Sequence, residues 1–123
     1  MTIDRMFIGG GALLLALAVA AGAYSAHAAR GAAHPEAARL LQTAVLYHLI
    51  HAMGILIAGV LSRFAASPWL AAAGLLHFAG IGLFCGALWV LALTARSMGV
   101  AAPLGGMCFI VGWLAMAVHG LRA

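Results

Sequence analysis

The sequence predicts an all-α fold, an integral membrane bundle of four helices that forms a single domain over residues 1–123. Hydrophobic residues make up 67% of the 123 residues, mean hydropathy is +1.16 and only 7% are charged, whereas about a quarter of the residues in a soluble domain are charged. Thirty alanines and sixteen glycines suit helices that pack closely in lipid, where small side chains let backbones approach. The lipid bilayer is therefore the expected solvent of the fold.

Four apolar stretches divide the chain, and each is close to the roughly 20 residues that a membrane-spanning helix needs. They cover residues 7–26, 40–61, 69–93 and 104–121. The connections between them hold charges or residues that begin helices. Ser67 and Pro68 are typical of an N-cap and the first helical residue, and Pro103 is expected to open the last helix.

The first stretch also has the features of a secretory signal peptide, because Arg5 precedes an apolar run that ends in the small-residue sequence Ala26-His27-Ala28. We expect it to remain in the protein as a membrane span. With four spans, both termini lie on one side of the membrane. Three arginines are then expected on each side, so the positive-inside rule does not choose an orientation.

The net charge of +4 and the pI near 10.1 do not indicate a nucleic-acid partner. All six basic residues are arginines that stand singly along the chain rather than clustered on one face. Each lies at or beyond the edge of an apolar stretch, because an arginine inside the bilayer would cost several kcal/mol. The arginines are therefore expected to mark helix ends.

Four motifs in the chain resemble, in their order and spacing, the family of small membrane proteins that includes YgdD and transmembrane protein 256, known as domain of unknown function 423. The motifs are GAYSAH at residues 22–27, QTAVLYHLIH at 42–51, LFCGALW at 83–89, and PLGG at 103–106 followed by Gly112-Trp113. The resemblance implies a four-helix architecture and supplies no reaction. We expect the location to be the inner, or cytoplasmic, membrane of a bacterium.

The chain departs from the family pattern at several positions. His48 stands where Gln is usual, Cys85 where Ser is familiar, and Tyr24-Ser25 where Phe-Gly is familiar. His77 lies outside the shared motifs. A role for His48 or His77 would therefore be particular to this chain.

Histidines within the apolar stretches are the main candidates for a functional site, because a polar group at bilayer depth must be desolvated. His48 and His51 lie about 12 and 16 Å into the second stretch, close to the midplane. His77 lies about 12 Å into the third stretch from the opposite face, near the depth of His51. Thr43, Tyr47 and His51 recur at intervals of four and form a polar stripe on one helix face.

Several interpretations of this group remain open. Tyr47 and His51 are expected first of all to bond to a neighbouring helix and fix its packing. Alternatively, His48, His51 and His77 bind a metal or provide axial ligands to a b-type haem, since imidazole suits iron and copper. A quinone, a lipid headgroup or proton transfer by histidine would also use these residues. No cofactor is favoured over simple packing.

His27 lies at the end of the first stretch and has two readings. With Gln42 and Thr43 at the start of the second stretch it could complete a polar cluster near one membrane face. Alternatively it caps the carbonyl groups that end its own helix.

Small residues at intervals of four predict close helix packing. Gly82 and Gly86 form a Gly-x-x-x-Gly pair, and Gly54 and Gly22 begin softer small-x-x-x-small pairs. We expect all of these glycines to pack helices within the chain, the alternative for Gly82 and Gly86 being a seam between chains. Cys85 is expected to be a free thiol, although Cys108 in the fourth stretch should lie at similar depth.

The sequence predicts a protein that is not an enzyme. Asp4 and Glu36 are the only carboxylates in the sequence and fall on opposite sides of the membrane, so paired acid and base chemistry is unsupported. The expected role is that of an accessory or scaffolding subunit that packs against other membrane proteins or against copies of itself. The alternatives are a haem, metal or quinone binding module at the midplane histidines, and a proton or ion conductor formed by an oligomer.

Overall fold

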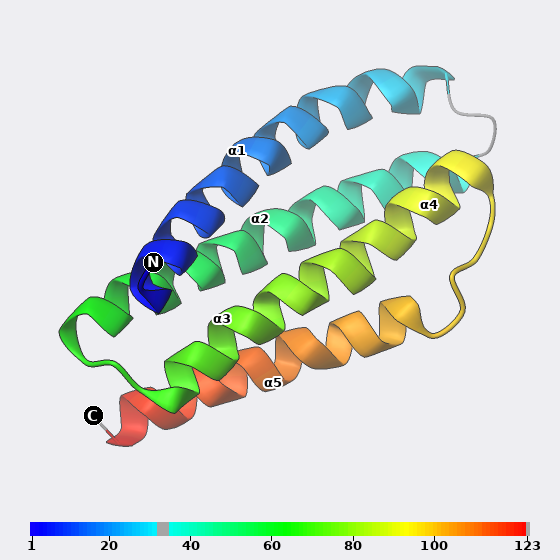
Figure 1. Ribbon diagram of the computed structural model, residues 1–123. Coiled ribbons are helices and arrows are strands. Elements are labelled where there is room, and N and C mark those ends of the chain that lie inside the picture. The colour runs from blue at the N-terminus through cyan, green and yellow to red at the C-terminus, as the bar shows by residue number, and fades with distance from the viewer. Residues whose placement is uncertain (32–34, 123) are drawn as a thin grey trace.

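The fold follows from four long helical segments (Figure 1). The structure is a computed structural model that describes residues 1–31 and 35–122. Its elements are, in order, α1 (Ile3–Ala28), the 3-10 turn η1 (Ala29–Gly31), α2 (Pro35–Phe64), α3 (Pro68–Gly80), the π-helical turn η2 (Ile81–Cys85), α4 (Gly86–Thr94) and α5 (Ala101–Arg122). Because α3, η2 and α4 follow one another without a break, we refer to Pro68–Thr94 as the third span.

The four helices have the length and composition that a bilayer requires. α1, α2, the third span and α5 contain 26, 30, 27 and 22 residues and are strongly apolar, and about 20 residues suffice to cross the hydrocarbon core. No strand is present in the described ranges. The prediction of an all-α, four-helix membrane bundle is confirmed.

Each helix extends beyond the apolar stretch predicted for it, because hydropathy marks only the part that lies in hydrocarbon. The prediction that Pro103 opens the last helix is wrong, since α5 begins at Ala101. Pro103 instead lies in the first turn, where its missing N–H removes no helical hydrogen bond. The start of α3 is as predicted: the Ser67 hydroxyl accepts hydrogen bonds from the backbone N–H of Trp69 at 3.1 Å and of Leu70 at 3.4 Å.

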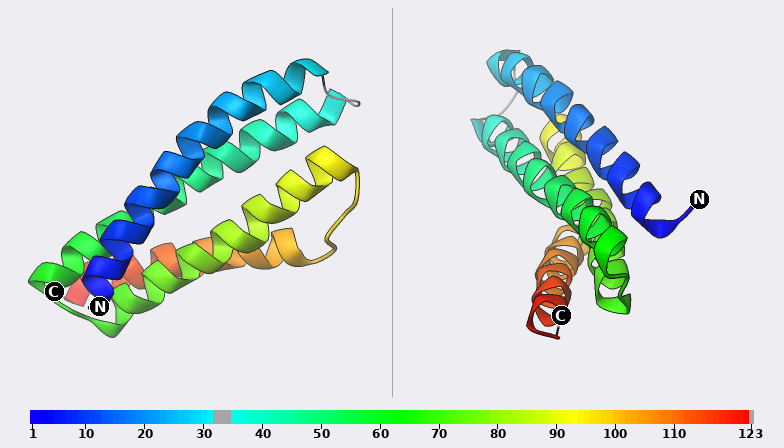
Figure 2. Two further views of the ribbon diagram at one scale, coloured as in Figure 1. Left: turned by 45° about the horizontal axis from the view of Figure 1, so that its top comes forward. Right: turned by 90° about the vertical axis from the view of Figure 1, so that its left-hand side faces the viewer.

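The helices form two hairpins that lie side by side. α1 packs mainly on α2, and α5 packs mainly on α3 and η2, while α2 contacts every part of the third span. Figure 2 shows α2 and the third span in the interior of this arrangement and α1 and α5 at its periphery. The hairpins diverge toward the end that holds the α1–α2 connection.

Both termini and the α2–α3 connection lie at the same end of the molecule (Figure 1). The guanidinium group of Arg63 lies 3.9 Å from the Asp4 carboxylate at this end. Arg30, Arg39 and Arg96 belong to the opposite end, as their positions at the connections require. The arrangement agrees with the predicted even number of spans.

Glycines bring the helices into backbone contact. A Cβ atom built at Gly11 of α1 would lie 2.8 Å from the backbone nitrogen of Leu56 in α2, and one built at Gly59 of α2 would lie 2.9 Å from Cβ of Phe7. Phe7 is fully buried and also contacts the glycine face of α3 at Gly74. Such distances leave no room for any side chain, so these glycines set the separation of the helices.

The predicted packing glycines behave differently from one another. A Cβ at Gly54 would lie 3.1 Å from the His77 ring, and one at Gly22 would lie 3.4 Å from the Val45 side chain, so both glycines lie at internal contacts. The expectation that Gly82 and Gly86 pack inside the chain is wrong, because a Cβ at either would meet nothing within 4 Å. The π-helical turn buries Ile81 and Cys85, which leaves the two glycines on the outer side of the third span.

Candidate functional site

Two histidines from different helices meet inside the bundle. His51 is near the middle of α2, and His77 is in α3. Their ring centroids are 5.4 Å apart and the ring planes are inclined by 32°. His51 is 5% exposed and His77 is 0% exposed. We call these two residues the histidine pair.

Each ring of the histidine pair is fixed by a hydrogen bond within its own helix. Nδ1 of His51 lies 2.6 Å from the carbonyl oxygen of Tyr47, and Nδ1 of His77 lies 2.6 Å from that of Ala73. Because a carbonyl oxygen only accepts, Nδ1 carries the proton in each neutral ring and Nε2 has a free lone pair. The expectation that His51 bonds to a neighbouring helix is therefore wrong for Nδ1, whose partner is the carbonyl one turn earlier in the same helix.

Aromatic rings surround the histidine pair. Phe109 of α5 is stacked on the His51 ring with 3.4 Å between the centroids and 13° between the planes. Trp113 lies edge-on to the His77 ring at 4.7 Å, with 83° between the planes. Tyr47 is stacked on His51 with 5.7 Å between the ring centroids. The pair therefore lies among π systems rather than among other polar groups.

Two glycines make room for His77. A Cβ at Gly112 of α5 would lie 2.8 Å from Cε1 of the ring, and a Cβ at Gly54 of α2 would lie 3.1 Å from its Nε2. The ring thus fills a space bounded by the backbones of two neighbouring helices. Its Nε2 atom is buried and has no hydrogen-bond partner in the described part of the chain.

His48 does not belong to this group, which corrects the expectation of a shared centre with His51 and His77. It lies on the face of α2 that is turned toward α1, close to the backbone of Leu14. Its Nε2 atom is buried and makes no hydrogen bond of standard geometry to a described residue. Three residues turn the helix by about 300°, so the two side chains leave α2 only about 60° apart, His48 toward Leu14 of α1 and His51 toward His77 and Phe109.

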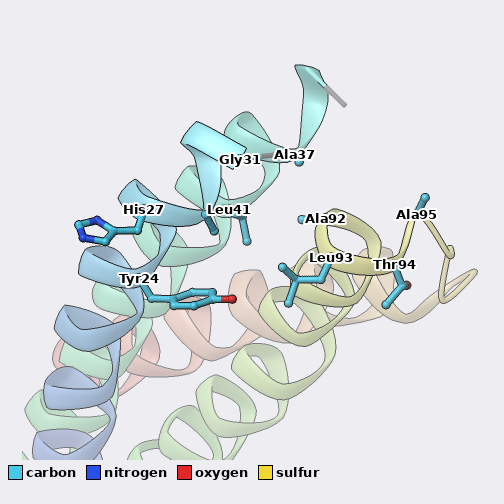
Figure 3. Close-up of a pocket in the computed structure, with 10 residues that line it drawn as sticks. Tyr24, His27, Gly31, Ala37, Leu41, Ala92, Leu93, Thr94 and Ala95 are labelled. Atoms are coloured by element: carbon cyan, nitrogen blue, oxygen red, sulfur yellow. The ribbon is translucent and has the colours of Figure 1, made fainter. Parts of the chain in front are cut away.

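His27 lies in a hollow between α1, α2 and α4 at the end where the hairpins diverge. The hollow has a volume of about 530 Å³, and Tyr24 points across it toward Leu93, while the His27 ring points away from α4 (Figure 3). Gln42 lines a separate hollow beside Gly22. Thr43 bonds to the carbonyl of Arg39 in its own helix. The predicted cluster of His27, Gln42 and Thr43 is therefore not formed.

The packing around the histidine pair bears on the alternatives left open by the sequence, which are binding of haem, metal or quinone and conduction through an oligomer. Phe109 covers one face of His51, and the backbones at Gly54 and Gly112 contact His77, so a haem macrocycle or a quinone ring does not fit beside the pair. No group of three or more His, Cys, Asp or Glu side chains that could hold a metal occurs in residues 1–31 and 35–122. Because the His51 ring faces α3 and α5 of its own chain, it does not line a surface between chains, as an oligomeric pore would require.

The histidine pair could be predicted from the sequence, but the residues that surround it could not. Counting residues from the helix ends brought His51 and His77 to similar depth. Phe109, Gly112 and Trp113 were not predicted to join them, because apolar residues in an apolar helix give no signal of the direction in which they point. Cys85 is a free, buried thiol and Cys108 is a free, partly buried one, as expected.

Comparison with known proteins places the chain among small bacterial membrane proteins. Residues 21–106 match the family model described as "Protein of unknown function (DUF423)". The chain is 36% identical over 120 residues to the UPF0382 membrane protein YwdK of Bacillus subtilis, which covers 96% of the chain and 98% of that relative. It is 37% identical over 121 residues to the UPF0382 membrane protein SERP0230 of Staphylococcus epidermidis, at 96% and 97% coverage. No solved structure matches the chain significantly.

Proposed function

The chain belongs to the DUF423 family of membrane proteins, and from this premise we propose that it is a non-catalytic accessory or scaffolding component that packs against other helices in a bacterial membrane. Four helices that suit a bilayer make up nearly all of the described chain. The described connections, residues 65–67 and 95–100, are short. The surface within the membrane is therefore the main surface available for an interaction.

The outward-facing pair Gly82 and Gly86 carries the proposal. Neither glycine meets another part of the chain within 4 Å of a built Cβ. Small residues four apart let a second helix approach closely enough for extensive van der Waals contact, which replaces the missing hydrophobic driving force in lipid. The neighbouring side chains of Leu83 and Val90 are exposed and would flank an approaching helix.

The ionisable groups support a non-catalytic role. Glu36 forms an exposed ion pair with Arg39 at 2.6 Å, and Asp4 lies 3.9 Å from Arg63 at the other end of the molecule. Each carboxylate is thus next to a cation and far from the other carboxylate. General acid and base catalysis needs such groups to converge on one substrate.

The proposal is tested by substituting the outer glycines with a bulky residue. Gly82→Leu/Gly86→Leu should weaken association with other membrane proteins, or with a second copy of the chain, by about tenfold or more, because helices could no longer approach closely. Gly9→Leu in α1 is the matched control, since Gly9 also has nothing within 4 Å of a built Cβ. Each tagged full-length variant is purified in mild detergent, and its oligomeric state and co-isolated membrane proteins are measured by light scattering and mass spectrometry.

Two results would contradict the accessory role. One is a wild-type protein that is strictly monomeric and co-isolates with nothing. The other is equal retention of partners by the wild type and by Gly82→Leu/Gly86→Leu. Thermal stability should not fall in any variant, because a Cβ at the substituted positions meets nothing within 4 Å and leucine is favoured over glycine in a helix.

A further inference from the structure

We propose that the Nε2 atoms of His51 and His77 form a two-coordinate binding site for a soft monovalent metal ion of the copper(I) type, buried in the middle of the bundle. The inference is independent of the accessory role, because the site lies between α2, α3 and α5 rather than on the outer surface at Gly82 and Gly86.

The hydrogen bonds of the histidine pair are those of metal ligands. A histidine that binds a metal through one nitrogen usually donates its other N–H to a carboxylate, a backbone carbonyl or water, which fixes the tautomer and the ring orientation. Both rings have this arrangement, with Nδ1 at 2.6 Å from a carbonyl oxygen. The carbonyl groups of Tyr47 and Ala73 therefore hold the proton of each ring on Nδ1 and leave the Nε2 lone pair of each ring free to bind a metal ion.

The separation of the rings suits one ion between them. With metal–nitrogen bonds of about 2 Å, two imidazoles on one ion have centroids about 6 Å apart when the arrangement is linear, and less when it is bent. The observed distance between the His51 and His77 centroids, 5.4 Å, is shorter than that of the linear arrangement that two-coordinate copper(I) prefers, so the rings must move slightly apart when the ion binds. Nε2 of His77 is buried without a hydrogen-bond partner in the described ranges, so metal binding would satisfy a group that is otherwise desolvated at a cost.

The charge of the surroundings selects a monovalent ion. Asp4 and Glu36 lie at the helix ends beside Arg63 and Arg39, so no carboxylate is available to neutralise a divalent ion among the described residues. The cost of burying an ion rises steeply with its charge. A singly charged ion is therefore the least costly to bury at this site.

Binding needs no accompanying chemistry. Two metal–nitrogen bonds form, each Nδ1 keeps its proton and its hydrogen bond to the carbonyl oxygen, and no proton or electron is transferred when the ion is supplied as copper(I). Imidazole is a suitable ligand for copper. A zinc(II) ion would need further ligands to complete a tetrahedral site, and the described chain brings no third ligand group to the pair.

The full-length protein in detergent or nanodiscs is titrated with copper(I) under anaerobic conditions in competition with a chromophoric chelator, and with silver(I) as a redox-inert probe. We expect one ion per chain. His51→Gln and His77→Gln should each weaken binding by at least about a hundredfold, since one of only two ligands is lost. His48→Gln is the matched control and should bind as the wild type does, because His48 faces α1.

X-ray absorption of the copper(I) complex should show two nitrogen neighbours and no sulfur. Absence of binding, equal loss of binding in His48→Gln, sulfur ligation by Cys85 or Cys108, or tighter binding of zinc(II) than of copper(I) would each overturn the proposal. If His77→Gln does not fold, as judged by circular dichroism, His51→Gln and the absorption spectrum of the wild type decide the matter. Gly82→Leu/Gly86→Leu should bind copper(I) normally, so failure of this site and failure of the accessory role can be told apart.

Discussion

His77 depends on the absence of a side chain at Gly112. A Cβ at this position would lie 2.8 Å from Cε1 and 2.9 Å from Nδ1 of the His77 ring, and the ring is held by its bond to the Ala73 carbonyl. Gly112→Ala should therefore destabilise the protein by about 1–3 kcal/mol, the usual cost of overpacking a core. The measurement is reversible unfolding in mixed detergent, followed by circular dichroism.

Gly120→Ala is the control for this substitution on the same helix. A Cβ at Gly120 meets nothing within 4 Å, and alanine is favoured over glycine in a helix, so its stability should equal or slightly exceed that of the wild type. Equal stability of Gly112→Ala and Gly120→Ala would contradict the close contact between α5 and the His77 ring.

The histidine pair shows what can be predicted for single residues. Its two members could be identified from the sequence because they are polar groups in lipid and because a helix has a fixed rise per residue. The hydrogen-bond partners of the two rings could not be predicted, because a polar group on a neighbouring helix and the carbonyl one turn earlier in the same helix can both accept the Nδ1 proton. The positions of Phe109 and Trp113 depend on how α5 is rotated about its axis, which no residue in α5 reveals.

At the level of elements, α5 contacts the third span at its π-helical turn. A Cβ built at Gly105 would collide with the backbone nitrogen of Phe84 in η2, whereas one built at Gly106 would lie 3.9 Å from the Phe84 ring. Gly105→Ala must therefore push two backbones apart and should cost about 1–3 kcal/mol, while Gly106→Ala should be close to neutral. The two proteins are compared by thermal unfolding.

Equal melting temperatures for these adjacent substitutions would contradict the close approach of α5 to η2. The comparison is well controlled because both positions lie in the first turns of the same helix and undergo the same chemical change. Any general effect of alanine on helix formation or on the lipid environment is then shared.

The helices themselves were predictable, but the faces that they turn inward were not. Backbone groups in lipid must be satisfied internally, so long apolar stretches become helices, and the cap at Ser67 follows from its hydroxyl and the proline beside it. Because each helix is apolar all round, hydropathy does not distinguish its buried side. Gly82 and Gly86 are therefore expected inside, whereas the π-helical turn after Gly80 directs them outward. Pro103 is likewise expected to be the first residue of the last helix but is the third residue of α5.

The whole molecule has a defined sidedness, which can be measured. Figure 1 places both termini and the α2–α3 connection at one end. Cysteines introduced by Thr2→Cys and Ala66→Cys should react with a membrane-impermeant maleimide from the same side of the membrane, and one introduced by Ser97→Cys should react from the other side. The three positions are exposed, and labelling is compared in vesicles of opposite orientation.

The wild type is the control for this experiment, because Cys85 and Cys108 lie within the spans and should not react. Labelling of Thr2→Cys and Ala66→Cys from opposite sides would contradict the four-span topology. It would also remove the contact between Asp4 and Arg63 at the shared end.

The separation of the bundle into two hairpins has a consequence for its biosynthesis. The contacts of Gly11 with Leu56 and of Gly59 with Phe7 join helices that are consecutive in the chain, and none of them requires the second half of the protein. These contacts between α1 and α2 can therefore form before the second half of the chain is synthesised, in keeping with the N-terminal-first folding of growing chains. The contacts of Phe7 with Gly74 and of His77 with Gly112 can form only afterwards, because they need α3 and α5.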